Sequence, residues 1–193
     1  GFTIDNKYVE YKLMVPDTIP DKYSKIAAMI EKRYNLHVRK LTRKDIYQGG
    51  YGQKIFDLIN DTYKHLYGYS ELSQKQIDQY IKMADLDLVV GVVDRSVTAA
   101  DDEQGVSQEE IDELGGKLVG FGVSFPSFAR ALQKTRNGKL LPWGWWYLLK
   151  VLKWHKTDTV DLLLIGVLPA YRVKGANAII FAHLIEQYHK YGF

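Results

Sequence analysis

The residues best suited to chemistry lie in a strand, a turn and a helix in the last third of the sequence. The apolar run Asp161–Val167 predicts a buried strand, and a helical pattern begins at Ala176. The turn between them carries two basic residues and a glycine: Arg172, Lys174 and Gly175. Such a turn directs backbone N–H groups toward a helix N-terminus, where the helix dipole favours negative charge. It predicts a site for a phosphate-bearing ligand; the alternative is an ordinary strand-to-helix turn with solvated basic side chains.

The same residues resemble a known signature. Val167-Leu168-Pro169 followed by Arg172-x-x-Gly175-x-Asn177 is similar to the acyl-CoA signature of the GNAT superfamily of CoA-dependent N-acyltransferases, V-x-P and then Q/R-x-x-G-x-G/A. The sequence departs from it at Asn177, where the family has Gly or Ala, and at Val173, where a small residue is common. The resemblance implies that an acyl-CoA, in the first place acetyl-CoA, binds here as cosubstrate. It assigns the pantetheine arm to the backbone of Ile165 and Val167, and the pyrophosphate to the N–H groups of Arg172, Val173, Lys174, Gly175, Ala176 and Asn177.

The resemblance also implies the reaction, in which a primary amine attacks the thioester carbonyl directly and no covalent enzyme intermediate forms. Two residues are candidates for the base. Asp161 starts the key strand, near where family members often carry a carboxylate, and His65 lies where the first two helices join, beside the acceptor site of the family. A histidine can act as a base near neutral pH. The alternatives are a solvated strand-end carboxylate and a solvated loop histidine; the tyrosine that protonates the leaving thiolate in the family would follow Phe193.

The composition of the chain limits its function classes. Its 193 residues suit one domain of ordinary size, and 46% hydrophobic residues are enough for a core. A formal charge of +3 is too small to indicate nucleic-acid binding. No cysteine and no metal-ligand spacing such as H-E-x-x-H occurs, so we expect no disulfide, no thiol nucleophile and no metal. Neither a signal peptide nor an apolar run of roughly 20 residues is present, so we expect a cytoplasmic protein, and nothing indicates its oligomeric state.

The spacing of apolar residues predicts both strands and helices. The expected strands are Lys7–Val15, Leu36–Leu41, Leu86–Val93, Lys117–Phe125 and Asp161–Val167. The expected helices are Pro20–Arg33, Lys44–Leu66 in two pieces around Gly49–Gly50, Ser73–Met83 and Ala176–Tyr191. From Leu36 this is the GNAT order up to its third main helix. We therefore expect an α/β protein of GNAT type, with a mixed, mostly antiparallel sheet flanked by helices and a parallel pair of strands splayed around the CoA arm.

Two segments interrupt this order. Arg95–Gly115 is rich in Asp and Glu, and we expect a solvated acidic hairpin extension there. Pro126–Lys156 contains four tryptophans and seven Lys and Arg residues but no acidic residue, and from Trp145 its apolar residues keep helical spacing. This basic aromatic helical insertion has two interpretations. It caps the sheet and buries its tryptophans, which we favour because a strand follows at once, or residues 143–154 contact the inner face of a membrane.

The insertion also narrows the resemblance. The run Asn137-Gly-Lys-Leu-Leu-Pro-Trp-Gly-Trp145 is similar to that of a poorly characterised bacterial GNAT branch with a second GNAT-like half upstream. It implies that the chain is a fragment: residues 1–35 would be an N-terminal strand–helix segment, starting with the tail of that half, and residues 36–193 a GNAT domain without its last strands. A non-catalytic acyl-CoA-binding or structural half is the alternative function. Some relatives are thought to acylate long-chain amino lipids, so a lipid amine at a membrane surface is an alternative acceptor.

Overall fold

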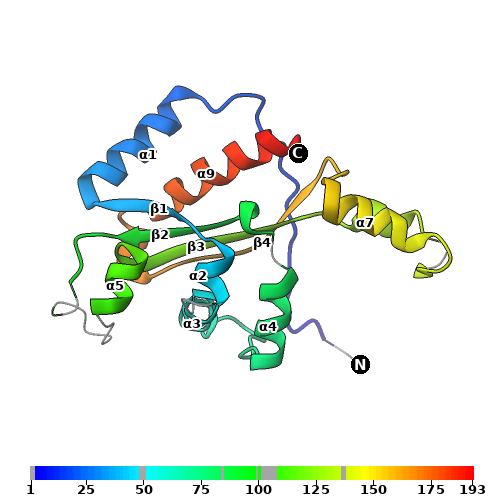
Figure 1. Ribbon diagram of the computed structural model, residues 1–193, viewed down its shortest axis with the longest axis horizontal. Coiled ribbons are helices and arrows are strands. Elements are labelled where there is room, and N and C mark those ends of the chain that lie inside the picture. The colour runs from blue at the N-terminus through cyan, green and yellow to red at the C-terminus, as the bar shows by residue number, and fades with distance from the viewer. Residues whose placement is uncertain (1–2, 48–50, 84, 99, 101–107, 136–137) are drawn as a thin grey trace.

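The computed structural model describes residues 3–47, 51–83, 85–98, 100, 108–135 and 138–193. These residues form a mixed α/β fold, in which one four-stranded sheet is flanked by helices on both faces (Figure 1). The strands are β1 (Leu36–Lys40), β2 (Val89–Asp94), β3 (Lys117–Pro126) and β4 (Val160–Val167). They lie in the order β1-β2-β3-β4, and each pair of neighbours is antiparallel. The sheet is therefore fully antiparallel, and the expected parallel pair is not found among the described residues.

The helices fall into two layers and an outlying hairpin. α1 (Asp21–Tyr34) and α9 (Ala176–Tyr191) pack against each other on one face of the sheet (Figure 1). The other face is covered by α3 (Tyr51–Tyr63), which is packed between the sheet, α2 (Arg43–Tyr47) and α4 (Gln74–Met83). The helical hairpin of α6 (Ala129–Gln133) and α7 (Gly144–Trp154) lies beyond one end of the sheet. The other short pieces are the 3-10 turn η1 (Leu86–Leu88), α5 (Gln108–Leu114) and α8 (Pro169–Arg172).

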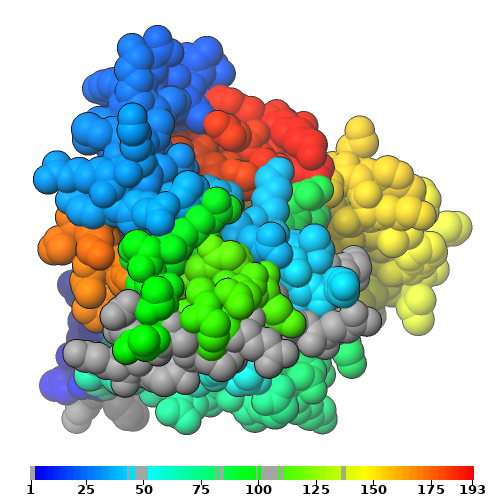
Figure 2. Space-filling model, turned by 60° about the vertical axis from the view of Figure 1, so that its left-hand side comes forward, coloured from blue at the N-terminus to red at the C-terminus, as the bar shows by residue number. Residues whose placement is uncertain are grey.

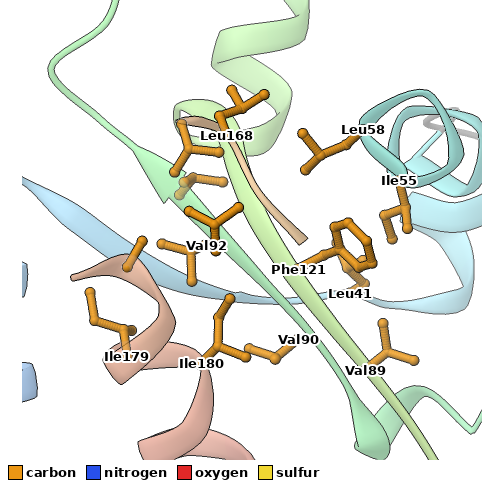
Figure 3. Close-up of a cluster of buried hydrophobic side chains, with 14 of the residues drawn as sticks. Leu41, Ile55, Leu58, Val89, Val90, Val92, Phe121, Leu168, Ile179 and Ile180 are labelled. Carbon is orange, nitrogen blue, oxygen red and sulfur yellow. The ribbon is translucent and has the colours of Figure 1, made fainter. Parts of the chain in front are cut away.

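The core has two halves separated by the strands. Figure 3 shows Ile179 and Ile180 of α9 on one side of the sheet and Ile55 and Leu58 of α3 on the other. All six residues of β2 are buried, which explains why this strand is an almost continuous run of valines rather than an alternating pattern. Burying these apolar side chains on both faces is the main force that holds the helices on the sheet.

Residues 3–20 differ from the prediction. Lys7–Val15 alternates in sequence, yet residues 3–20 contain neither helix nor strand, and the side chain of Leu13 is 83% exposed. The predicted strand is wrong: in the described part of the chain no strand lies beside this segment to accept its hydrogen bonds, and an isolated strand is not stable in water. Val15 packs against the core, and hydrogen bonds from two other places also tie the segment to the body. The hydroxyl of Tyr8 donates to the carbonyl of Tyr67, and the ring of His189 donates to the carbonyl of Pro16.

The two expected interruptions also differ in part from the prediction. Part of the acidic segment is a helix, α5 (Gln108–Leu114), which packs against β3 and buries Ile111 and Leu114. The burial of these two apolar side chains stabilises the helix, whereas the expected solvated hairpin was inferred from the charges alone. The acidic residues Asp101, Asp102 and Glu103 lie outside the described residues. The basic aromatic insertion is helical as expected, but α7 packs chiefly on α6 and does not cover the sheet.

Candidate functional site

The outer edge of β4 carries backbone groups that no strand in the described part of the chain pairs. At Ile165 one side chain fills this gap. The hydroxyl of Tyr63 donates to the carbonyl of Ile165 at 2.8 Å and accepts from its N–H at 3.2 Å. At Val167, Nε of Arg172 donates to the carbonyl at 3.0 Å. The two residues assigned to the pantetheine arm by the resemblance are therefore already hydrogen-bonded to side chains.

Tyr63 reaches the strand because α3 lies very close to β4. A Cβ at Gly166 would lie 2.4 Å from the ring of Phe121 and 2.9 Å from the hydroxyl of Thr62, so only glycine fits there. Ile55 and Ile59 on the same face of α3 are buried and hold the helix in this position. The close approach of helix and strand thus brings a phenol to an open strand edge.

An apolar cavity of about 270 Å³ lies beside this contact, between α3, α4 and the sheet. Its walls are almost entirely hydrocarbon and aromatic side chains: Ile46, Gly52, Ile55, Phe56, Ile59, Tyr63, Tyr69, Leu72, Tyr80, Val89, Val123, Phe125, Leu163 and Leu164. A cavity of this size and lining suits an apolar group such as an acyl chain or the hydrophobic part of an amine. Because Leu164 precedes Ile165, the cavity adjoins the strand edge directly.

The cavity has a short polar side made of phenols. The rings of Tyr63 and Tyr69 lie 6.1 Å apart, and the hydroxyl of Tyr69 donates to the amide oxygen of Asn60. Burial, followed by the nearby Glu71 and Tyr63, raises the pKa of Tyr69 above its ordinary value. The phenol therefore stays protonated at neutral pH and acts as a hydrogen-bond donor rather than as a base.

The turn after β4 has the expected form but uses several of its N–H groups internally. The N–H of Lys174 donates to the carbonyl of Tyr171, and that of Gly175 donates to the carbonyl of Arg172, each at 3.2 Å. Ala176 is completely buried. Of the predicted phosphate ligands, the exposed Asn177 in the first turn of α9 keeps an N–H that has no acceptor within the helix.

The basic residues of the turn face protein groups. Nζ of Lys174 lies 4.2 Å from the centre of the Tyr171 ring, a cation–π contact. The hydroxyl of Tyr171 in turn donates at 2.9 Å to the buried carboxylate of Asp94. Gly175 has a φ of +80°, and a Cβ there would lie 2.8 Å from Cδ1 of Ile30 in α1. The glycine thus satisfies both the backbone conformation of the turn and the packing of α1. Val173, one of the two departures from the signature, is 90% exposed.

The two predicted bases lie apart from the cavity lining. Asp161 pairs with Phe125 near the start of β4 and is exposed. His65 is exposed in the turn that follows α3. Within the described part of the chain, neither residue lines the apolar cavity. Their catalytic roles stay predictions, and the group nearest the strand edge is the hydroxyl of Tyr63.

In the sequence, Tyr63 has the spacing of a buried position in the predicted helix Lys44–Leu66, and this spacing predicts no role for it in a site. A signal was present, because a tyrosine on an otherwise aliphatic helix face must find a partner for its hydroxyl. Which partner it finds depends on the distance between α3 and β4, and the spacing of residues in one helix does not reveal this. No group of three or more potential metal ligands gathers in the residues that the structure describes.

Comparison with known proteins leaves the assignment to the residues themselves. No protein-family model matches the chain, and neither a curated protein nor a solved structure does.

Proposed function

We propose that the chain binds an acyl-CoA along β4 and transfers its acyl group to a primary amine. The observation that carries the proposal is the order of features along β4: an apolar cavity beside Leu164, then the strand edge at Ile165 and Val167, which side chains rather than a strand bond, then the turn and the start of α9. An acyl-CoA presents an apolar acyl group, an amide-containing arm and phosphates in that same order. Hydrogen bonds from a strand edge suit the amides of the arm, and a helix N-terminus suits a phosphate.

The proposed reaction needs four changes at the thioester. The substrate ammonium first loses a proton to a base, for which Asp161 and His65 are the candidates, and becomes the neutral amine. Its nitrogen then attacks the thioester carbonyl, a C–N bond forms and the carbonyl oxygen becomes negative. The carbonyl re-forms as the C–S bond breaks and the electron pair leaves with sulfur, and the thiolate takes up the proton that the attacking nitrogen gives up, which yields the amide and free CoA. A backbone N–H at the strand edge stabilises the oxyanion, and the candidate is that of Ile165, which follows the cavity residue Leu164. This N–H becomes free once the hydroxyl of Tyr63 turns away.

A second candidate is a non-catalytic domain that binds acyl-CoA. Two observations favour it: neither Asp161 nor His65 lines the cavity, and the backbone groups of Ile165 and Val167 are bonded to side chains. A domain of this kind would hold the acyl group in the cavity without activating an amine.

The experiment that tests the proposal is calorimetric titration with CoA, acetyl-CoA and a medium-chain acyl-CoA, followed by turnover assays with a panel of primary amines. The chain has no cysteine, so the thiol of released CoA can be followed with a thiol reagent without background. We expect the acylated forms to bind more tightly than CoA and thiol release to depend on an amine. Binding without release would favour the second candidate, and binding of none of the three would overturn both.

The base is tested in the same assay. Asp161→Asn and His65→Ala each remove one candidate, and both side chains are exposed, so the fold should survive. If one of them is the base, kcat falls by roughly 100-fold or more and acyl-CoA affinity stays unchanged.

A further inference from the structure

The hairpin of α6 and α7 stands out from the body and leaves large apolar side chains in solvent. Figure 1 shows α7 lying beyond the end of the sheet, and Figure 2 shows the same segment, in yellow, projecting from the surface. Trp143 is 74% exposed, and Trp145, Trp146 and Trp154 are exposed as well. The expectation that these tryptophans are buried against the sheet is therefore wrong. A tryptophan cluster left in water has a cost that a partner surface would remove.

The same hairpin is strongly basic. Residues 126–156 carry seven Lys and Arg residues and no Asp or Glu, whereas the formal charge of the whole chain is only +3. The rest of the chain is thus net negative, and the positive charge is concentrated where the tryptophans are. A surface that combines exposed indoles with clustered cations suits an anionic, amphiphilic partner.

A groove of about 880 Å³ runs between α6, α7 and the end of α9. Its basic lining residues come from both sides: Arg130 and Lys134 from α6 and the residue after it, and Lys150 and Lys156 from α7 and the loop that follows. Asp158, the acidic group among the described lining residues, forms an ion pair with Arg130. The groove thus combines basic side chains with the aromatic rings of Trp146 and Trp154, a combination that suits a phosphate headgroup attached to a hydrocarbon chain.

Indoles and ammonium groups lie side by side on α7. Nζ of Lys150 is 5.5 Å from the centre of the Trp146 ring, and Nζ of Lys153 is 5.4 Å from that of Trp154. In this arrangement the rings can enter the boundary between headgroups and acyl chains while the amines stay at the level of the phosphates. None of the described helices is long and apolar enough to cross a bilayer, so such a contact would be peripheral.

The base of the hairpin is fixed to the body. His155 ends α7 with a φ of +48°, its Nε2 lies 2.6 Å from Oδ2 of Asp85, and its ring centre lies 4.4 Å from that of Tyr191. Tyr191 also donates its hydroxyl to Asp87. These contacts join α7 to the segment before β2 and to the end of α9, so the hairpin is presented as a supported protrusion.

We propose that α7 and the groove beside it dock the protein on a bilayer that contains anionic phospholipids. The exposed indoles of α7 enter the interface, and the cations of the groove bind phosphate headgroups. This surface lies outside the acyl-CoA site, and its role does not depend on acyl transfer.

The test is co-sedimentation with vesicles of phosphatidylcholine alone and with vesicles in which a third of the lipid is phosphatidylglycerol. We expect binding to the second vesicles, weakened at high salt, and a blue shift of tryptophan fluorescence on binding. Two variants remove the two parts of the surface: Trp143→Ser with Trp145→Ser, and Lys150→Glu with Lys156→Glu. Each variant should weaken partitioning into the anionic vesicles at least about tenfold. The reason is that each exposed indole and each cation near an anionic surface contributes to membrane binding, and each variant changes two of them.

Matched controls exist elsewhere on the surface. Tyr11→Ser with Leu13→Ser removes two exposed apolar side chains from the N-terminal segment, and Lys22→Glu with Lys25→Glu makes the same charge change on α1. Both controls should bind as the parent chain does. The proposal is overturned by equal binding to both kinds of vesicle, by no binding, or by equal losses in the controls. It is also overturned if sedimentation shows a dimer that Trp143→Ser with Trp145→Ser abolishes, because a second copy would then cover the face.

Discussion

At the scale of single residues, Tyr63 and Arg172 bond backbone groups on the outer edge of β4, which no strand of the described residues pairs. The hydroxyl of Tyr63 bonds both backbone groups of Ile165, and the guanidinium of Arg172 bonds the carbonyl of Val167. A ligand that pairs with this strand edge has to displace them. These hydrogen bonds therefore stabilise the unliganded chain and would compete with the acyl-CoA that we propose to bind here.

Replacement of Tyr63 by Phe tests this competition. The change leaves the N–H and C=O of Ile165 without their partner, so we expect the free energy of unfolding to fall by about 1–3 kcal/mol. Acyl-CoA should bind more tightly, because it no longer displaces a hydroxyl. Chemical denaturation and calorimetry measure the two effects, and Tyr80→Phe, in the same cavity wall, is the matched control. Unchanged stability would contradict the role given to the hydroxyl.

The sequence predicted the strand and the turn of this site, but it did not predict Tyr63, the side chain that bonds Ile165. The apolar strand, Pro169 and Gly175 are local signals, and local signals can be recognised without a structure. The prediction of Asp161 and His65 rests on where the resembling family has its catalytic residues. In the structure the side chain that contacts Ile165 is that of Tyr63. Tyr63 and Ile165 are 102 positions apart in the sequence, so their contact depends on how α3 packs on β4. The spacing of residues within one element does not reveal that packing.

At the scale of elements, the turn between β4 and α9 allows α1 to pack closely, whether or not it also binds a ligand. Gly175 combines a left-handed backbone with contact to Ile30, so α1 packs directly over the turn. The helices themselves were predicted well. α9 begins and ends where expected, and α1 is displaced by one residue at each end, because capping signals and helical spacing are local.

Gly175→Ala should destabilise the chain by about 1–2 kcal/mol, because alanine is strained at this backbone conformation and its methyl group would crowd Ile30. Gly192→Ala has a similar φ of +75° with open space around the position, so it reports the backbone strain alone. Denaturant unfolding of both variants gives the difference. Adding Ile30→Val to Gly175→Ala should recover part of the loss, and equal losses at the two glycines would argue against the packing contribution.

α7 shows what the sequence leaves open at this scale. Its helical spacing and basic character were predicted correctly, but its surroundings were not. An apolar helix face indicates that something covers it, and periodicity alone does not distinguish a sheet from a lipid surface.

At the scale of the whole molecule, the order of the four strands and of α2, α3, α4 and α9 was predicted correctly from Leu36 onward because each of these elements has its own apolar pattern, whereas α5 and α6 were not predicted. The α/β class with a mostly antiparallel sheet was also predicted, but the predicted parallel pair is not found among the described residues. That Lys7–Val15 stays unpaired in the described structure was not predictable, since alternation describes one strand and a sheet needs two. The same limit applies to the acidic segment, where two buried apolar side chains outweigh the charges.

The pH dependence of stability is a property of this packed whole. Burial in the α9 layer, together with the charge of Lys40 on β1, lowers the pKa of His183 below its ordinary value, and Glu186 opposes the shift. Below the unfolded value of about 6.5 the unfolded chain therefore binds a proton that the folded chain resists, and stability falls as pH decreases. His183→Gln should flatten this loss between pH 7 and 5 in thermal melts. The same change at exposed His65 serves as control, and an unchanged slope in His183→Gln would contradict the assignment.

The open edge of β4 has one more consequence, for the colloidal behaviour of the chain. Exposed strand edges are templates on which other chains add strands and aggregate. Here the edge carries exposed Leu162 and Leu163, which would favour such addition. Tyr63 bonds both backbone groups of Ile165, and Arg172 bonds the carbonyl of Val167, so fewer free groups are left for an added strand. We therefore expect these two side chains to lower the tendency of the protein to aggregate through its own sheet.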